Sequence, residues 1–177
     1  MQEPSIENKI TEMQNKYYTI NQKSRIFPNQ QKFDCASLIT QSFNKTTLFS
    51  QSVYIVSNTN HIFIDYPKFK TFGCPEIYEE YIAYILQLID ECLAKYTTYE
   101  IHVNMQSFTA TAAQRYKEMI YILINTCLSQ NTGISFKVTA IYLYNAAKMI
   151  DAIMHLFSGL VNDDVKYKIH IVNNSST

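Results

Sequence analysis

The stretch IYLYNAAKMIDAIMHLF, from Ile141 to Phe157, changes its periodicity halfway along. Its first residues alternate aromatic and β-branched side chains, which is typical of a β-strand. After Asn145 the apolar residues recur at helical spacing, so we expect a helix over residues 146–160. Its apolar stripe is wider than a helix needs to cover one side of a sheet, so two interpretations stay open, a buried core helix or the wall of a hydrophobic cavity. The stripe consists of Met149, Ile150, Ile153, Met154, Leu156, Phe157 and Leu160.

Strand and helix patterns alternate on either side of this stretch. Helical periodicity covers residues 76–95 and 112–127, and strand patterns cover residues 99–105, 137–144 and 167–172. Strands that alternate with helices imply right-handed crossovers and a largely parallel sheet with helices packed on it. We therefore predict a single α/β domain of three layers, in which a mixed, mostly parallel β-sheet has flanking helices.

The N-terminal segment carries fewer apolar periodic positions than the rest of the chain. We expect residues 1–50 to be a helical or irregular extension of an α/β domain that spans residues 51–177. One helix should begin near Ser5, and a second, short helix should have Asp34 as its N-cap. The sparse apolar stripes predict one or two helices that pack on the domain.

Three short segments are predicted to be turns or loops. The letters NTN at residues 58–60 separate two alternating runs and predict a β-hairpin. The segment PKFKTFGCP at residues 67–75 contains Pro and Gly and is expected to be a loop. The letters NDD at residues 162–164 are expected to form a turn before the last strand.

The composition excludes several classes of protein. Among 177 residues, 15 Lys and Arg residues balance 15 Asp and Glu residues, so the chain lacks the basic excess of a nucleic-acid-binding protein. There is no signal-peptide pattern and no apolar run long enough to span a bilayer. The four cysteines form no CxxC pair, which favours reduced, buried thiols in a cytoplasmic protein. They are Cys35, Cys74, Cys92 and Cys127.

The motifs of common enzyme classes are missing from the sequence. It contains no GxGxxG, no GxxxxGK[ST] and no GxSxG motif, so we expect neither an enzyme nor a cofactor. His102 and His170 both lie in predicted strands. If these strands pair, the two rings approach each other as a metal or acid–base site; the alternative is a half-exposed or hydrogen-bonded histidine at each position.

The C-terminal third resembles the CRAL-TRIO (Sec14-like) lipid-binding domain. In that family a strand ends in Asn-Ala-Pro, an apolar gate helix follows, and a short turn leads to Ser-Lys-Ile. The matching residues here are Asn145-Ala146-Ala147, the predicted helix, the acidic turn and Tyr167-Lys168-Ile169. Upstream, IHVNMQSFTATAAQRY is similar to the family's strand, Asp-x-x-Gly and helix start. The resemblance covers residues 50–174.

The chain departs from the family pattern at several positions. Asn104 stands where the family usually has Asp, Ser107 stands where it has Gly, and Ala147 replaces the Pro. In members that bind phosphoinositides, a Glu precedes the Asn-Ala-Pro strand and pairs with a Lys. Here Phe136 matches that Glu, whereas Lys168 matches the Lys, so half of this head-group site is missing.

The resemblance implies a non-enzymatic lipid-binding or lipid-transfer protein that contacts a membrane surface transiently. Thr109 and Thr111, near a helix start, would then hydrogen-bond a phosphate or carbonyl group; the alternative is that they cap the helix. The alternative function is a degenerate protein-interaction module, as in the divergent branch of the family whose members bind small GTPases and each other. The residues that we expect to contact a lipid or other hydrophobic ligand are Thr109, Thr111, Tyr116, Met149, Ile153, Met154, Phe157 and Lys168.

Overall fold

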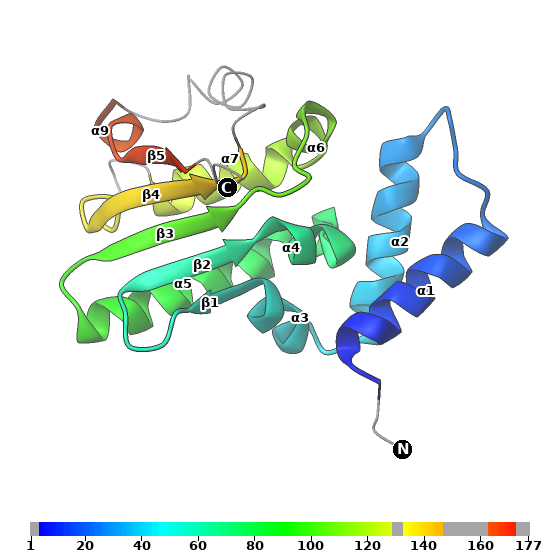
Figure 1. Ribbon diagram of the computed structural model, residues 1–177, viewed down its shortest axis with the longest axis horizontal. Coiled ribbons are helices and arrows are strands. Elements are labelled where there is room, and N and C mark those ends of the chain that lie inside the picture. The colour runs from blue at the N-terminus through cyan, green and yellow to red at the C-terminus, as the bar shows by residue number, and fades with distance from the viewer. Residues whose placement is uncertain (1–3, 129–132, 147–162, 173–177) are drawn as a thin grey trace, which may run out of the picture.

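The computed structural model describes residues 4–128, 133–146 and 163–172. In this part of the chain one sheet has the strand order β1-β2-β3-β4-β5 (Figure 1). Its strands are β1 (Val53–Ile55), β2 (His61–Asp65), β3 (Tyr99–Asn104), β4 (Val138–Tyr144) and β5 (Ile169–Val172). Strand β1 pairs antiparallel with β2, and the pairs from β2 to β5 are parallel. The predicted mixed, mostly parallel sheet in a single α/β domain is confirmed.

The described residues also form eight helices, which lie before, between and after the strands along the chain. They are α1 (Ile6–Ile20), α2 (Pro28–Ser42), α3 (Lys45–Ser52), α4 (Tyr66–Phe72), α5 (Tyr78–Lys95), α6 (Ala110–Arg115), α7 (Lys117–Cys127) and α9 (Asp163–Lys166), with a 3-10 turn at Pro75–Ile77. In Figure 1 the strands face the viewer, and α5 and α7 lie behind them. The crossovers from β2 to β3 and from β3 to β4 each move one strand along the sheet in the same direction. Right-handed crossovers therefore put their helices on the same face.

The two faces of the sheet differ in chemistry because side chains alternate along each strand. Ile64, Val103 and Leu143 lie in register on the face that packs against α5 and α7. The opposite face carries a row of rings, one on each of four neighbouring strands. These residues are Phe63, His102, Tyr142 and His170. The first face forms the core, and the second face presents aromatic and imidazole groups.

Within residues 4–52, three helices precede the first strand, where the sequence predicts one or two. Helix α1 begins where the sequence predicts, because Ser5 Oγ accepts a hydrogen bond from the backbone N–H of Asn8 at 3.2 Å. The prediction that Asp34 caps a second helix is wrong, since Pro28 opens α2 from its first turn and Asp34 lies in its middle. Proline is favoured there because its missing N–H needs no partner.

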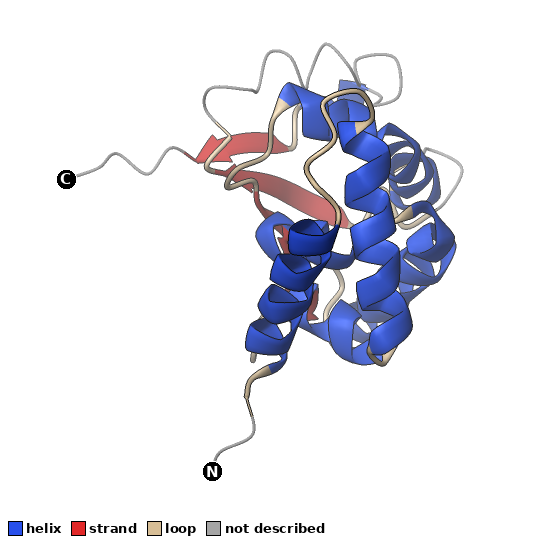
Figure 2. Cartoon of the chain, turned by 90° about the vertical axis from the view of Figure 1, so that its right-hand side faces the viewer, coloured by secondary structure: helices blue, strands red, loops and turns tan. Residues whose placement is uncertain are grey.

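The N-terminal helices share their core with the sheet domain. Buried hydrophobic residues form one cluster that runs from Ile10 in α1 through α2 and α3 to the sheet and α5. Figures 1 and 2 show α1 and α2 as a hairpin beside α3 and α4, away from β4 and β5. The expectation that residues 1–50 pack on the domain agrees with this cluster, while the domain boundary near residue 50 stays a prediction.

Residues 67–75, for which the sequence predicts a loop, lie largely in the helix α4. In α4 the aromatic residues Tyr66, Phe69 and Phe72 recur every three residues, and all three are buried. Pro67 does not break this helix because it occupies the first turn, where a missing N–H costs nothing. The Pro and Gly residues marked the two ends of a short buried helix.

Two other boundaries differ from the sequence predictions. The helix predicted over residues 112–127 is divided into α6 and α7 at Tyr116, whose φ of −96° and ψ of 15° are not helical. Asp163 and Asp164 open the short helix α9 instead of forming only a turn, and acidic residues are favourable in a first turn.

The helix predicted over residues 146–160 falls almost entirely outside the described residues, and the arrangement in three layers stays a prediction. Met149, Ile153, Met154 and Phe157 therefore stay predictions. Within the described ranges, no helix combines the length and the hydropathy that a bilayer crossing requires.

Candidate functional site

An apolar cavity of about 170 Å³ lies between the sheet and helices α4 to α7. It is lined by Ile64, Tyr66, Phe69, Tyr81, Ile85, Val103, Met105, Phe108, Tyr116, Met119, Ile120, Leu123 and Leu143. A cavity of about 150 Å³ with a similar lining stays dry and binds benzene. This cavity therefore has room for an aromatic ring or for part of an acyl chain.

Aromatic side chains form the end of the cavity nearest to α4 and α6. The Tyr66 ring packs edge-on against Phe108 at 4.8 Å and against Tyr116 at 6.1 Å, between ring centroids. Tyr116 is almost fully buried and also packs edge-on against Phe69 at 5.3 Å. Burial raises the pKa of Tyr66 to about 12, so its hydroxyl stays neutral. Tyr116 was predicted to contact a ligand, and the structure places it in this apolar lining.

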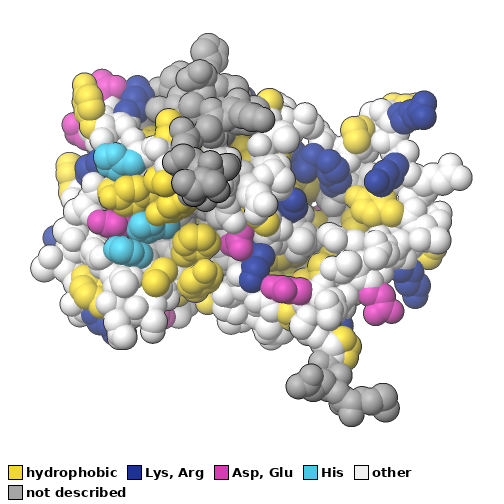
Figure 3. All heavy atoms as spheres, viewed as in Figure 1, with side chains coloured by type: hydrophobic (Ala, Val, Ile, Leu, Met, Phe, Trp, Pro, Cys, Tyr) yellow, Lys and Arg dark blue, Asp and Glu magenta, His cyan; other side chains and the backbone are white. Residues whose placement is uncertain are grey.

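A second hollow, the basic pocket, has a volume of about 350 Å³ and lies where α1, α2, α4 and α6 meet. Its lining residues are Gln14, Tyr18, Lys32, Cys35, Ala36, Tyr66, Lys70, Thr71, Ser107, Thr109, Ala112 and Arg115. Three of these described residues are cationic and none is acidic. Figure 3 shows Lys and Arg side chains gathered where the N-terminal helices meet the rest of the molecule.

Two of the three cations of the basic pocket donate hydrogen bonds to neutral partners. Lys70 Nζ donates to Ser107 Oγ at 2.7 Å, and Arg115 Nε donates to Asn29 Oδ1 at 3.0 Å. Desolvation, and then repulsion by Arg115 and Lys70, lower the pKa of Lys32. Among the described residues, no ion pair includes Lys32, Lys70 or Arg115. A bound anion would relieve this repulsion.

The remaining predicted contacts outside the 146–160 segment have identifiable roles. Thr109 is the N-cap of α6 and accepts a hydrogen bond from the backbone N–H of Ala112 at 3.2 Å, while also lining the basic pocket. Thr111 is exposed on α6. Lys168 donates from Nζ to the backbone carbonyl of Ser135 at 3.3 Å, away from both hollows. The structure therefore brings Thr109 and Tyr116 to neighbouring hollows and leaves Lys168 apart from them.

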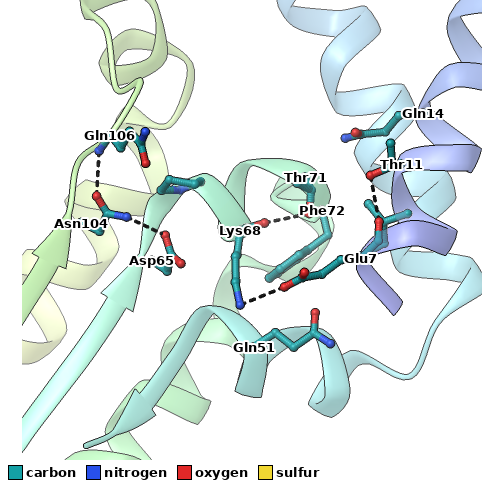
Figure 4. A pocket seen from close by; sticks show the side chains of 12 residues that line it. Glu7, Thr11, Gln14, Gln51, Asp65, Lys68, Thr71, Phe72, Asn104 and Gln106 are labelled. Atoms are coloured by element: carbon teal, nitrogen blue, oxygen red, sulfur yellow. Dashed lines mark hydrogen bonds and ion pairs between the residues drawn. The ribbon is translucent and has the colours of Figure 1, made fainter. Parts of the chain in front are cut away.

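A third hollow of about 340 Å³ lies at the carboxyl ends of β2 and β3, beside α1 and α4 (Figure 4). Ligands often bind at the carboxyl ends of strands in open α/β sheets. Here, however, Lys68 pairs with Glu7 at 3.0 Å, and Asp65 accepts a hydrogen bond from Asn104 at 3.1 Å. Because these charged groups already have partners, this hollow is a weaker candidate than the basic pocket.

The sheet face opposite the cavity holds a cluster of titratable side chains. Nε2 of His61 and Nε2 of His102 each lie 3.3 Å from Oε2 of Glu100. The two imidazole rings are stacked with centroids 4.5 Å apart. Burial, and then the neighbouring His61, lower the pKa of His102. Nδ1 of His102 also lies 2.8 Å from the hydroxyl of Tyr144.

His102 and His170 do not form a joint site, because the strands that carry them do not pair with each other. Strand β4 lies between β3 and β5, so Tyr142 separates the two rings and stacks on both, at 4.8 and 5.2 Å between centroids. His61 on β2 takes the place expected for His170. The sequence signal that could have identified it is the alternation of Glu100 and His102 on one face beside the strand HIFID.

The comparisons with known proteins concern the fold. No family model matches the sequence, and no curated protein matches it. The crystal structure of Sfh5, a Sec14-family protein, superposes on this chain with a TM-score of 0.57 and 14% sequence identity. The match covers 94% of this chain and 66% of Sfh5, so the chain spans about two thirds of that protein's length. This likeness confirms the predicted Sec14-like fold.

Proposed function

We propose that this protein binds an amphipathic lipid, or another hydrophobic ligand with an anionic head group, and does not catalyse a reaction. The Sec14-like fold supports a lipid as the ligand. The observation that carries the proposal is the position of Tyr66, which lines both the apolar cavity and the basic pocket. A ligand that occupied both hollows would need an apolar part and a negative charge.

The apolar part of the ligand would enter the cavity behind the sheet. Small-ligand pockets usually measure about 300–1,000 Å³, so a cavity of about 170 Å³ holds only part of a long acyl chain. Met105 and Met119 line it, and their flexible side chains can move aside for a longer chain. In this proposal the segment 146–160 acts as a gate, and Met149, Ile153, Met154 and Phe157 contribute further contacts.

The anionic part of the ligand would occupy the basic pocket. Lys32, Lys70 and Arg115 supply the positive charge, and the hydroxyl groups of Ser107 and Thr109 supply hydrogen-bonding groups. Charge-assisted hydrogen bonds to phosphate or carboxylate are about twice as strong as neutral ones. A phosphate monoester or a carboxylate head group therefore suits the pocket better than a zwitterionic one.

The cellular setting is part of the proposal. Four free and buried thiols suit a reducing compartment, so we place the protein in the cytoplasm. Loading from a bilayer would require transient contact with its surface. The proposal includes no nucleic acid, because the chain has no overall basic excess and its positive charge is gathered in one small pocket.

The experiment is a lipid-loading assay on the full chain. Native mass spectrometry and solvent extraction of the purified protein identify any lipid that it already carries. The protein is then incubated with phosphatidylcholine vesicles with or without phosphatidic acid, and the lipid that it retains is measured. We expect a bound lipid with an anionic head group and preferential uptake of phosphatidic acid.

Charge variants test the role of the basic pocket. Lys32→Gln and Lys70→Gln should each reduce phosphatidic acid uptake about tenfold, since a charge-assisted hydrogen bond contributes about 1.5–3 kcal/mol. Lys16→Gln and Lys117→Gln are matched controls, because both residues are exposed and lie outside the pocket. If the wild-type protein neither carries nor takes up lipid, the proposal is wrong, and the protein-interaction module, binding small GTPases or a second copy, becomes the leading hypothesis.

A further inference from the structure

We propose that His61, Glu100 and His102 form a binding site for a divalent transition-metal ion such as Zn²⁺. These residues belong to β2 and β3, and their ligand atoms all lie within 4.8 Å of one another. The site is separate from the hollows proposed to bind a lipid.

The sheet itself brings the three side chains together. Glu100 and His102 are two residues apart on β3, so they project from the same face of the sheet. His61 on β2 lies directly opposite Glu100 in the parallel register. Figure 3 shows adjacent His side chains beside an acidic side chain on this face, in agreement with the stacking of His61 on His102. Positions on paired strands are better fixed than positions on a loop, as a metal site requires.

The distances and the donor set suit zinc. Two Nε2 atoms lie 3.3 Å from the same Oε2 atom of Glu100. Zinc binds imidazole nitrogen at about 2.0–2.1 Å and carboxylate oxygen at about 2.0–2.2 Å, which puts tetrahedral ligand atoms roughly 3.3–3.5 Å apart. Two histidines and one glutamate also form a common three-ligand set for zinc with an open fourth position. Mg²⁺ and Ca²⁺ prefer oxygen ligands, so imidazole nitrogens select against them.

The ring of His102 is held in the orientation that a metal ligand needs. Its Nδ1 lies 2.8 Å from the hydroxyl of Tyr144 on β4, while its Nε2 is directed at Glu100. Histidines that bind metals usually hold their second ring nitrogen in a hydrogen bond of this kind. The Tyr142 ring stacks against His102 at 4.8 Å and restricts it further.

An ion can reach the site from solvent. The side chains of His61, Glu100 and His102 are 36%, 25% and 12% exposed. The cluster is therefore open to solvent at His61 and largely covered at His102. The apolar cavity lies on the other face of the sheet, where Val103 alternates with the two ligand positions of β3. Loss of metal binding and loss of lipid binding are therefore distinguishable.

The test is titration of the chelator-treated full chain with ZnCl₂ by isothermal titration calorimetry. We expect one Zn²⁺ per chain, and Co²⁺ should give the visible absorption of a tetrahedral or five-coordinate site. His61→Ala and Glu100→Gln should each weaken zinc binding about 100-fold or more. Tyr144→Phe should weaken it about tenfold, as expected for a hydrogen-bond partner of a ligand.

His170→Ala is the matched control, because His170 lies on the same face and stacks on Tyr142 but is not in the cluster. It should leave zinc affinity and stoichiometry unchanged. His61 is partly exposed, so His61→Ala should keep the thermal unfolding midpoint of the metal-free protein. The proposal is overturned if the wild-type chain binds no zinc, or if His170→Ala weakens binding as much as His61→Ala.

Discussion

Asn145 donates a hydrogen bond from its side-chain Nδ2 to Oδ1 of Asn104 across 3.0 Å. The same oxygen accepts the backbone N–H of Gln106 at 3.1 Å, and Nδ2 of Asn104 donates to Asp65 at 3.1 Å. A series of side-chain hydrogen bonds therefore joins the carboxyl ends of β2, β3 and β4. Asn145 belongs to the Asn-Ala pair that matches the family pattern, and Asn104 stands where the family usually has Asp, so both positions have a structural role here.

The first prediction concerns Asn145, whose backbone has a φ of 60°. Asn145→Ala removes a hydrogen bond that contributes about 1 kcal/mol. It also puts a Cβ without a local polar group in the left-handed region, which costs roughly 1–2 kcal/mol. We expect a loss of about 2 kcal/mol in the free energy of unfolding. Urea denaturation followed by circular dichroism measures it, since the chain has no Trp to report by fluorescence.

Asn145→Gly separates the two contributions. Glycine adopts a positive φ without steric cost, so this variant should lose mainly the hydrogen bond and remain about 1 kcal/mol more stable than the alanine variant. Equal stability of the two variants would show that the backbone conformation at Asn145 costs nothing.

The second prediction concerns two buried tyrosines, of which one hydroxyl group has a hydrogen-bond partner and the other has none in the described part of the chain. The hydroxyl of Tyr99 has no hydrogen-bond partner among the described residues, whereas the hydroxyl of Tyr81 lies 3.0 Å from Ser52 Oγ. A buried polar group without a partner costs about 1–3 kcal/mol. Tyr99→Phe should therefore raise the free energy of unfolding by about 1 kcal/mol, and Tyr81→Phe should lower it by a similar amount.

Thermal unfolding followed by circular dichroism compares the two variants directly. Both substitutions remove one oxygen atom from a fully buried ring, so their difference reports on hydrogen bonding and not on volume. Destabilisation by both variants to the same degree would mean that the Tyr99 hydroxyl has a partner in solution, such as a water molecule.

The periodic parts of the fold could be predicted from the sequence, because local patterns decide them. The sequence of helix α5 carries an apolar stripe along its whole length, and the sequences of β3 and β4 are rich in the β-branched and aromatic residues of a strand. The helix α4 was missed because Pro67 and Gly73 are local breakers, while burial of its aromatic residues is a tertiary effect. The break at Tyr116 was missed for the same reason, since its ring packs into the cavity lining.

The candidate site depends on strand order, which local sequence patterns do not contain. His102 was identified as a strand histidine, but its neighbour follows from β2 pairing with β3 and β4 separating β3 from β5. The position of His61 opposite Glu100 follows from the register of β2 and β3. Likewise, Lys32, Lys70 and Arg115 come from three separate helices, and only the packing of these helices makes one basic pocket.

The third prediction tests the apolar cavity itself. Val103 lines the cavity from β3, and Val103→Ile adds one methylene group to empty space. A buried methylene contributes about 0.8 kcal/mol, so the free energy of unfolding should rise by that amount. The smaller cavity should also retain less of any hydrophobic ligand in the loading assay.

Val138→Ile is the matched control, since Val138 is fully buried but lies outside the cavity lining, and overpacking there should cost about 1–3 kcal/mol. If both isoleucine variants are destabilised alike, Val103 is as closely packed as Val138, and the cavity cannot receive the apolar part of a ligand.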